Sequence, residues 1–156
     1  AMQRVAAIAV VHEMLSQAYD DEVAFDDVAD RLLRMVADVA TTAGKVRIRR
    51  VGSFGAVPAD VATSLSLVLT ELCQNAVEHG LGQGAGEVRV LPHPVNGELV
   101  VEVENHGEPL PDGFDLANST SLGLSIVSTL VDDLGGTFSL RSDEVATVAT
   151  VRVPLH

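Results

Sequence analysis

The sequence predicts an α+β fold, a two-layer sandwich in which helices cover one face of a sheet built from antiparallel hairpins. The clearest signal is Asn96-Gly97, which joins two runs of alternating apolar residues. Because both residues tolerate positive φ, this dipeptide predicts a tight hairpin. A second pair of alternating runs follows Gly135-Gly136, and apolar residues at helical spacing occupy the segments before each pair. This order of elements excludes a doubly wound parallel sheet.

Two helices are predicted before the first strand. The segments from Arg4 to Ala18 and from Asp26 to Thr41 repeat apolar residues at helical spacing, and acids open the second, where the helix dipole favours them. The expected inward residues are Val5, Ile8, Val11, Leu15 and Ala18 in the first helix, and Val28, Leu32, Met35, Val36 and Val39 in the second. The broad apolar face of the first helix needs a partner.

The first predicted strand runs from Lys45 to Val51 and alternates basic with apolar residues. Its expected inward residues are Val46, Ile48 and Val51. Its basic residues are Lys45, Arg47, Arg49 and Arg50, out of 10 in the chain. We interpret them as the solvent face of a strand in an acidic protein.

The longest predicted helix begins at Pro58, which the first turn of a helix tolerates, and ends at Gly80. Its apolar stripe consists of Val61, Leu65, Leu69, Leu72 and Ala76. Another face carries Glu71, Asn75 and Glu78. Glu71 and Asn75 lie one turn apart, so their carboxylate and amide oxygens can converge on a Mg²⁺ ion. The simpler alternative is a solvated polar edge, and spacing alone favours that alternative.

Two hairpins and one more helix complete the predicted fold. The first hairpin pairs Glu87–Val95 with Glu98–Glu104, and the last pairs Thr137–Arg141 with Thr147–Val153. The first places Leu99, Val101 and Val103 on one face. The helix between the hairpins is capped by Ser121, and its apolar residues are Leu124, Val127, Leu130, Val131 and Leu134. Gly135-Gly136 ends that helix.

Composition restricts the classes of partner. A formal net charge of −12 argues against electrostatic binding to nucleic acid or anionic lipid, because those partners require Lys and Arg to neutralise phosphate. No apolar run is long enough for a membrane span, and the single cysteine, Cys73, fits a reducing compartment. We therefore expect a soluble, cytoplasmic protein, with Cys73 as a buried apolar side chain.

Three segments in this order resemble the nucleotide-binding boxes of the GHKL superfamily, which includes gyrase, Hsp90, MutL and the histidine kinases. Glu71 to His79 resembles the N-box E-L-x-x-N-A-x-x-H. Asn105 to Pro111 resembles the first glycine box, and Ser121 to Leu124 the second. The resemblance spans residues 45–155 and implies the Bergerat ATP-binding fold, with a mixed, mainly antiparallel sheet.

The resemblance implies a site for ATP and Mg²⁺. Asn75 would coordinate Mg²⁺ that bridges the phosphates, Glu71 would orient or deprotonate the accepting imidazole, and Asn105 would take the place of the family's adenine-binding Asp. The implied nucleotide-binding residues are Asn75, His79, Asn105, Gly107, Pro109, Leu110, Thr120, Ser121, Leu122, Gly123, Leu124 and Thr147. His79 has a simpler alternative as a C-terminal helix cap.

Residues Arg4 to Leu15 are similar to the second dimerisation helix of sensor histidine kinases with the alternative dimerisation domain, especially the actinobacterial PdtaS-like group. We therefore expect the C-terminal part of a dimerisation helix in residues 1–22 and the catalytic domain in residues 23–156. The phosphoacceptor histidine would lie on a first dimerisation helix that is absent here, which leaves His12 as a packing residue or, alternatively, the phosphoacceptor. The implied partners are this dimerisation domain, a second copy of the protein and a response regulator, which in this group can carry an RNA-binding antiterminator domain.

The chain departs from the family pattern at several positions. Asn105 is neutral where the family has Asp, Pro109 and Ser121 replace glycines, and Ala146 stands where a glycine often precedes Thr147. Glu78 puts a negative charge where Lys is common. Because charge-assisted hydrogen bonds are the stronger kind, these departures predict weakened ATP affinity. Two alternatives share the fold, namely an anti-sigma-factor serine kinase and a degenerate pseudokinase.

Overall fold

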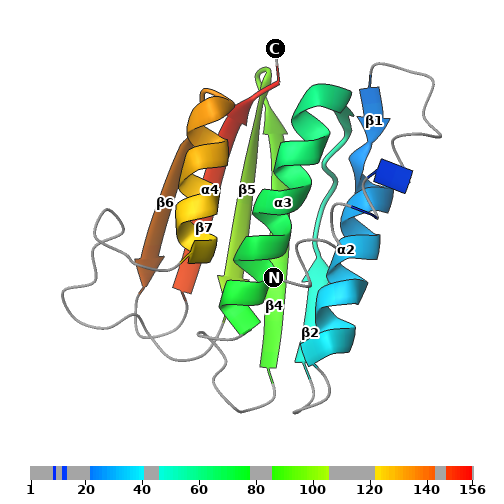
Figure 1. The fold of residues 1–156 in the computed structure, drawn as a ribbon, viewed down its shortest axis with the longest axis vertical. Helices are drawn as coiled ribbons and strands as arrows, with labels where there is room; N and C mark the ends of the chain where they lie inside the picture. The colour runs from blue at the N-terminus through cyan, green and yellow to red at the C-terminus, as the bar shows by residue number, and fades with distance from the viewer. Residues whose placement is uncertain are drawn as a thin grey trace.

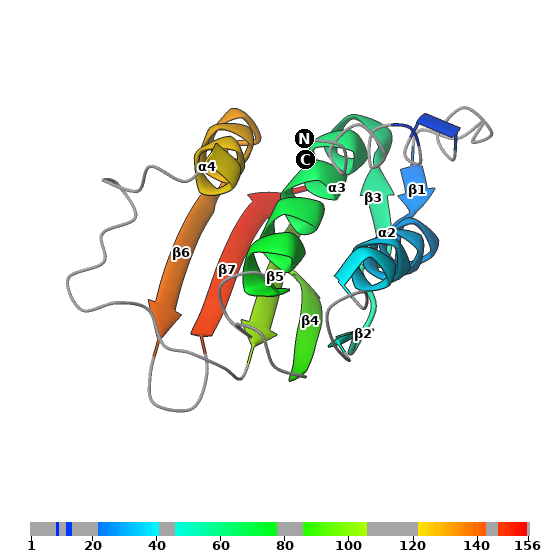
Figure 2. The same cartoon turned by 60° about the horizontal axis from the view of Figure 1, so that its bottom comes forward.

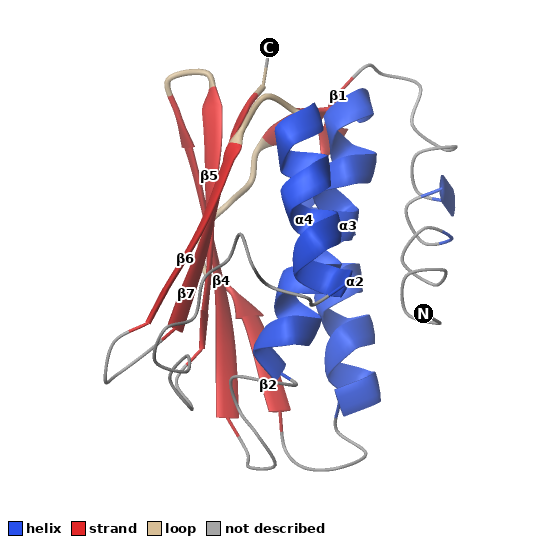
Figure 3. Ribbon diagram, turned by 60° about the vertical axis from the view of Figure 1, so that its left-hand side comes forward, coloured by secondary structure: helices blue, strands red, loops and turns tan. Residues whose placement is uncertain are grey.

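The computed structural model describes residues 9, 12, 13, 22–40, 46–77, 86–105, 122–142 and 147–155. Its helices and strands, in chain order, are β1 (Glu22–Ala24), α2 (Phe25–Ala40), β2 (Val46–Arg50), β3 (Ala56–Pro58), α3 (Ala59–Asn75), β4 (Gly86–Val95), β5 (Glu98–Asn105), α4 (Leu122–Asp133), β6 (Thr137–Ser142) and β7 (Thr147–Pro154). The predicted α+β sandwich is confirmed, because α2, α3 and α4 all cover one face of the main sheet (Figures 2 and 3).

The main sheet is mixed and mainly antiparallel, as predicted. Its five strands follow the order β2-β4-β5-β7-β6. Only the pairing of β2 with β4 is parallel, and the other three pairings are antiparallel. The residues of its central strands alternate between a buried face under the helices and an open face, so the core lies between the two layers.

The sequence prediction for α3 is confirmed in both start and stripe. Pro58 precedes the first residue of the helix, where its missing N–H costs nothing. All five residues of the predicted stripe are buried. The core also holds the hydroxyls of Ser66 and Thr70, which donate to the carbonyl oxygens of Ala62 and Ser66 at 2.7 and 2.9 Å. These bonds satisfy two polar groups that would otherwise be costly to bury.

The helix α2 begins one residue before the predicted start. Val28, Leu32 and Val36 are buried as expected, and Met35 is half-buried. Phe25 is also fully buried, and its ring meets that of Phe54 edge-on with centroids 4.9 Å apart. This aromatic pair joins the start of α2 to the chain before β3 and so helps to fix where the helix begins.

Two predictions about the first strand are wrong. Val51 follows β2 and is 41% exposed, because the two-residue period puts it on the same side as Arg47 and Arg49. Arg50 has the opposite orientation and is half-buried, so it is not part of the solvent face. Arg47 and Arg49 are exposed as predicted, and Lys45 lies outside the described residues.

A small second sheet was not predicted. It consists of β1 and β3, which pair antiparallel from Glu22↔Pro58 to Ala24↔Ala56. Each strand has only three residues, too few for a visible alternation of apolar and polar residues. The pairing ties the chain just before α2 to the residue just before α3.

Both predicted turns around the hairpins are confirmed. Asn96 and Gly97 have φ values of 52° and 80°, and β4 pairs with β5 on either side of them. At the end of α4, Gly135 has a φ of 76° and donates to the carbonyl of Asp132, while Gly136 donates to that of Val131. This pair of bonds is a Schellman motif, which ends the helix and starts β6.

The predicted N-terminal helix lies largely outside the described residues. Ala9, His12 and Glu13 are helical and exposed, and the apolar residues expected to face inward there are not among those described. Arg31 of α2 contacts Glu13 through an exposed ion pair of 3.4 Å. A search of the described helices finds none that is long and apolar enough to cross a membrane.

Candidate functional site

The elements that carry the predicted site end at the same side of the domain (Figure 1). The C-terminal end of α3 lies there, beside the N-terminal end of α4, and the two helices pack against each other. The end of β5 and the start of β7 lie behind them in the sheet as direct neighbours. Segments that are distant in the sequence therefore lie at the same end of the domain, and their elements contain Glu71, Asn105 and Gly123.

Glu71 and Asn75 occupy the last turns of α3. Glu71 is only 4% exposed, whereas Asn75 is half-buried. The interpretation of both as a solvated polar edge is therefore wrong for Glu71. Beyond Asn75 the helix widens to π-helical geometry at Ala76 and Val77, a local change that often accompanies functional sites. The described part of the chain gathers no group of three or more His, Cys, Asp and Glu residues that could hold a metal by themselves.

Asn105 and Thr147 lie directly opposite each other on β5 and β7. Both are buried, at 3% and 8% exposure, on the sheet face that the helices cover. Val88 of β4 is the partner of Asn105 on its other side, so the three residues form one row across the sheet. The next row on this face consists of Val90, Val103 and Ala149. The polar pair thus borders an apolar part of the core.

The N-terminal end of α4 offers backbone donors. Leu122 begins the helix, Gly123 is half-buried and Leu124 is buried. The first N–H groups of a helix have no acceptor within it, and the dipole adds partial positive charge there. The first turn of α4 contains no acidic residue that would counter this charge. This end of the helix is therefore suited to an anion such as phosphate.

Seven of the predicted site residues belong to described elements, namely the last turns of α3, the end of β5, the start of β7 and the start of α4. The seven residues are Glu71, Asn75, Asn105, Leu122, Gly123, Leu124 and Thr147. The remaining predicted residues, His79, Gly107, Pro109, Leu110, Thr120 and Ser121, lie outside the described residues. Sequence reasoning missed the apolar row beside Asn105, because only the strand register places Val103 and Ala149 next to it.

Cys73 lies in the same part of α3 but takes no part in a reactive site. It is fully buried, and this burial raises the pKa of its thiol to about 12. The reactive thiolate form is therefore scarce at neutral pH. The prediction that Cys73 is an apolar core side chain is confirmed.

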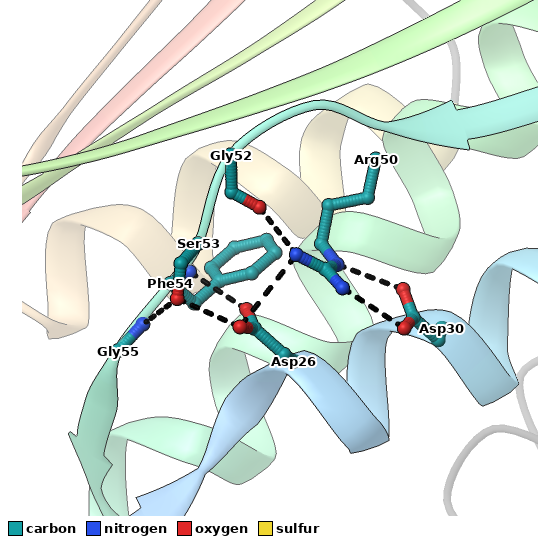
Figure 4. A network of polar contacts seen from close by, with 7 residues as sticks. All are labelled: Asp26, Asp30, Arg50, Gly52, Ser53, Phe54 and Gly55. Carbon is teal, nitrogen blue, oxygen red and sulfur yellow. Dashed lines mark hydrogen bonds and ion pairs between the residues drawn. The ribbon is translucent and has the colours of Figure 1, made fainter.

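A polar network joins the start of α2 to the chain after β2 (Figure 4). The carboxylate of Asp26 accepts hydrogen bonds from the backbone N–H of Phe54 and the hydroxyl of Ser53, both at 2.7 Å. Arg50 donates to both oxygens of Asp30 and to the carbonyl of Gly52. The network fixes the chain between β2 and β3 against α2. It lies apart from the ends that carry Glu71 and Asn105.

Comparison with known proteins identifies this arrangement. The family model described as histidine kinase-, DNA gyrase B-, and HSP90-like ATPase matches residues 60–156. The chain belongs to this ATPase family. The GHKL resemblance predicted from the sequence boxes is thereby confirmed, although the family match begins at residue 60 and omits β2.

Two relatives of this ATPase family domain are mycobacterial. The sensor histidine kinase PdtaS of Mycobacterium tuberculosis is 42% identical over 158 residues, and that of Mycolicibacterium smegmatis is 41% identical over 158 residues. Each alignment covers 99% of this chain and 32% of the relative, so the chain spans about a third of their length.

Solved structures show the same fold. The histidine kinase domain of the Erythrobacter litoralis EL346 blue-light activated histidine kinase superposes with a TM-score of 0.83. The match covers 99% of this chain and 74% of that chain, at 23% sequence identity. The family match and the mycobacterial relatives thus agree on the ATPase domain, and the solved structure shows the same fold.

Proposed function

We propose that the chain is the ATP-binding catalytic domain of a two-component sensor histidine kinase. It transfers the γ-phosphoryl group of ATP to a histidine on the dimerisation domain, for relay to a response regulator. The observation that carries the proposal is that the C-terminal end of α3, the end of β5 and the N-terminal end of α4 lie at one end of the domain, and that Glu71 and Asn105 in these elements are buried. Family membership and the mycobacterial sensor kinases support it.

Each part of the site has a role in this reaction. Phosphoryl transfer depends mainly on positioning and on neutralising charge, and both are supplied by fixed groups. The backbone donors of α4 hold phosphate oxygens. Glu71, buried one turn before Asn75, orients or deprotonates the accepting imidazole. The proposed roles of His79, Ser121 and Gly107 in the nucleotide site rest on the family resemblance alone.

The donor set fits Mg²⁺. This ion prefers oxygen ligands and keeps several of them from water and substrate phosphates rather than from a protein cage. An amide oxygen from the half-buried Asn75 agrees with that preference, as does the lack of a larger cluster of ligands in the described residues. When bound, Mg²⁺ neutralises charge on the phosphates. Asn75 then fixes where the triphosphate lies relative to Glu71.

The partners follow from the reaction. The domain needs its own dimerisation domain as phosphoacceptor, within a homodimer, and a response regulator, which can carry an RNA-binding antiterminator domain. The first 22 residues are the end of a dimerisation helix, and residues 23–156 form the catalytic domain. The reaction takes place in the cytoplasm, where ATP is supplied.

A phosphorylation assay tests the proposal. The chain is mixed with radiolabelled Mg·ATP and a dimerisation segment of a mycobacterial PdtaS, and the acid-labile label on histidine is measured. The unmodified chain is expected to label the segment, and Glu71→Gln to lower the rate by about 100-fold or more. Asn75→Ala is expected to lose both labelling and binding of Mg·ATP.

Glu98→Gln is the matched control, because Glu98 is an exposed carboxylate of β5 on the open face of the sheet. It is expected to leave labelling unchanged. Label on a serine of an anti-anti-sigma protein instead of histidine would support the serine kinase alternative. The absence of both label and nucleotide binding would identify a pseudokinase and contradict the proposal.

A further inference from the structure

The side-chain amide of Asn105 is buried at the end of β5, and its Nδ2 atom has no hydrogen-bond partner among the described residues. Native proteins rarely leave a buried donor unsatisfied, and the exceptions usually reflect a ligand, an ion or a water that completes the bond. Asn105 therefore has an unsatisfied hydrogen-bond donor at the end of β5, an element that belongs to the proposed nucleotide site.

The surroundings of Asn105 select the part of a nucleotide that binds there. Its row contains Val88 and Thr147, and the next row on the same face holds Val103 and Ala149, all of them buried. An amide and a hydroxyl at the border of an apolar core suit a flat, uncharged base better than a triphosphate. A triphosphate needs donors with positive charge, and the N-terminal end of α4 offers these instead. The base therefore belongs beside Asn105 and the phosphates beside α4.

We propose that Asn105 makes the site accept 6-oxo purines as well as 6-amino purines, so that ATP and inosine triphosphate (ITP) bind with similar affinity. The inference rests on the proposed nucleotide-binding function. Adenine presents an N–H donor at position 6, whereas guanine and hypoxanthine present a carbonyl acceptor there. The amide of Asn105 can accept a hydrogen bond from the 6-amino group through Oδ1. After the amide plane rotates by half a turn, Nδ2 can donate to the 6-oxo group instead.

A carboxylate at this position would discriminate strongly. An ionised Asp only accepts hydrogen bonds, so it pairs with a 6-amino group and repels a 6-oxo group. Thr147, the strand partner of Asn105, has a hydroxyl, a group that can both donate and accept a hydrogen bond. The choice of base is therefore controlled by the single atom that distinguishes Asn from Asp at residue 105.

Calorimetric titration of the chain with Mg·ATP, Mg·ITP and Mg·GTP tests this inference. Inosine triphosphate lacks the 2-amino group of guanine, so its base differs from adenine only at position 6 and in the proton on the adjacent N1. In the unmodified chain, the Kd values for ATP and ITP are expected to agree within about tenfold. In Asn105→Asp, the preference for ATP over ITP is expected to rise by about 10- to 100-fold. The charged carboxylate strengthens the hydrogen bond from the 6-amino group and repels the 6-oxo group.

Asn96→Asp provides the matched control. It makes the same change of charge at the exposed hairpin turn, where Asp tolerates the positive φ of 52°. It is expected to leave the ratio of the two Kd values unchanged. If Asn105→Asp does not fold, Asn105→Leu replaces it, and the loss of both donor and acceptor should weaken ATP and ITP equally.

The outcomes separate the inference from the proposed function. Binding of ATP together with ITP that binds more than 100-fold more weakly would overturn the inference and leave the kinase proposal standing. An unchanged ratio in a folded Asn105→Asp, or a loss confined to ATP in Asn105→Leu, would also overturn it. If none of the three nucleotides binds at millimolar concentration, the proposed function fails as well.

Discussion

Arg50 of β2 holds Asp30 of α2 with two parallel hydrogen bonds (Figure 4). Nε donates to Oδ1 at 2.8 Å and Nη2 donates to Oδ2 at 3.0 Å. The flat guanidinium matches the flat carboxylate, and Arg50 also lies 3.6 Å from Asp26. The pair therefore joins a helix to the sheet through geometry that Lys cannot reproduce.

The first prediction concerns this pair. Arg50→Lys is expected to destabilise the domain by about 1 kcal/mol, because the ammonium replaces only one of the two bonds. The coupling energy in a double-mutant cycle with Asp30→Asn should be about 0.5–1 kcal/mol, since the Asp30 side chain is 38% exposed and solvent screens the pair. Urea unfolding measures both quantities.

Arg49→Lys serves as the control for that prediction. Arg49 is exposed on the other side of the same strand, and its ion pair with Glu87 has a single contact of 3.2 Å. It is expected to change stability by less than about 0.5 kcal/mol. Equal losses for Arg49→Lys and Arg50→Lys would show that the two-bond geometry contributes nothing.

A second prediction concerns pH. The hydrogen bonds from Arg50 lower the pKa of Asp30 below its ordinary value of 3.8, against a smaller opposing effect of partial burial. A carboxyl whose pKa is lower in the folded state contributes stability above its unfolded pKa and loses it as the pH falls through the folded value. The stability difference between the wild type and Asp30→Asn should therefore be constant from pH 7 to about pH 5 and shrink below about pH 4. Urea unfolding at a series of pH values checks this; a difference that grows on acidification would contradict it.

Much of the fold could be predicted because its signals are local. The spacing of Val61, Leu65 and Leu69 repeats over many turns, and Asn96-Gly97 has few alternatives to a hairpin turn. The position of Pro58 likewise marks a helix start from the residue alone. Elements of this kind need no knowledge of what packs against them.

The rest depends on contacts between distant residues. Arg49 and Arg50 are adjacent and chemically identical, yet Arg49 is exposed and Arg50 bonds to Asp30 of α2. No local pattern in the sequence distinguishes the two. The burial of Glu71 was likewise hidden, because an E-x-x-x-N pair is common on exposed helices. The position of Asn105 opposite Thr147 depends on a register that only the paired strands define. The site was predicted from family boxes, whereas the surroundings of its residues required the structure.

A third prediction concerns Cys73. Because burial raises the pKa of its thiol to about 12, the folded chain should not react with a thiol reagent at pH 8. Addition of urea above the unfolding midpoint should restore reaction at the rate of a free thiol. The reaction with Ellman's reagent, followed by absorbance, measures both states. Rapid, stoichiometric reaction of the native chain would show that α3 opens readily beside Glu71.

The last prediction concerns Gly136, which follows the Schellman motif at the end of α4. A Cβ atom at this position would overlap the backbone carbonyl oxygen of Arg152 and lie 2.9 Å from Cγ1 of Val153. The strand β7, which contains both residues, cannot yield easily, because Arg152 pairs with Val100 on one side and Thr137 on the other. Gly136→Ala is therefore expected to destabilise the domain by at least about 2 kcal/mol, measured by urea unfolding.

The neighbouring glycine separates this packing effect from backbone strain. Gly135 has a φ of 76°, but its Cβ would meet only Pro154 Cγ at an ordinary 3.8 Å. Gly135→Asn should therefore cost less than about 1 kcal/mol, since Asn tolerates a left-handed backbone, and Gly135→Ala about 1–2 kcal/mol. If Gly136→Ala were milder than Gly135→Ala, the close approach of α4 to β7 would not be rigid. A rigid approach matters for the proposed site, because the other end of α4 is the one proposed to bind phosphate.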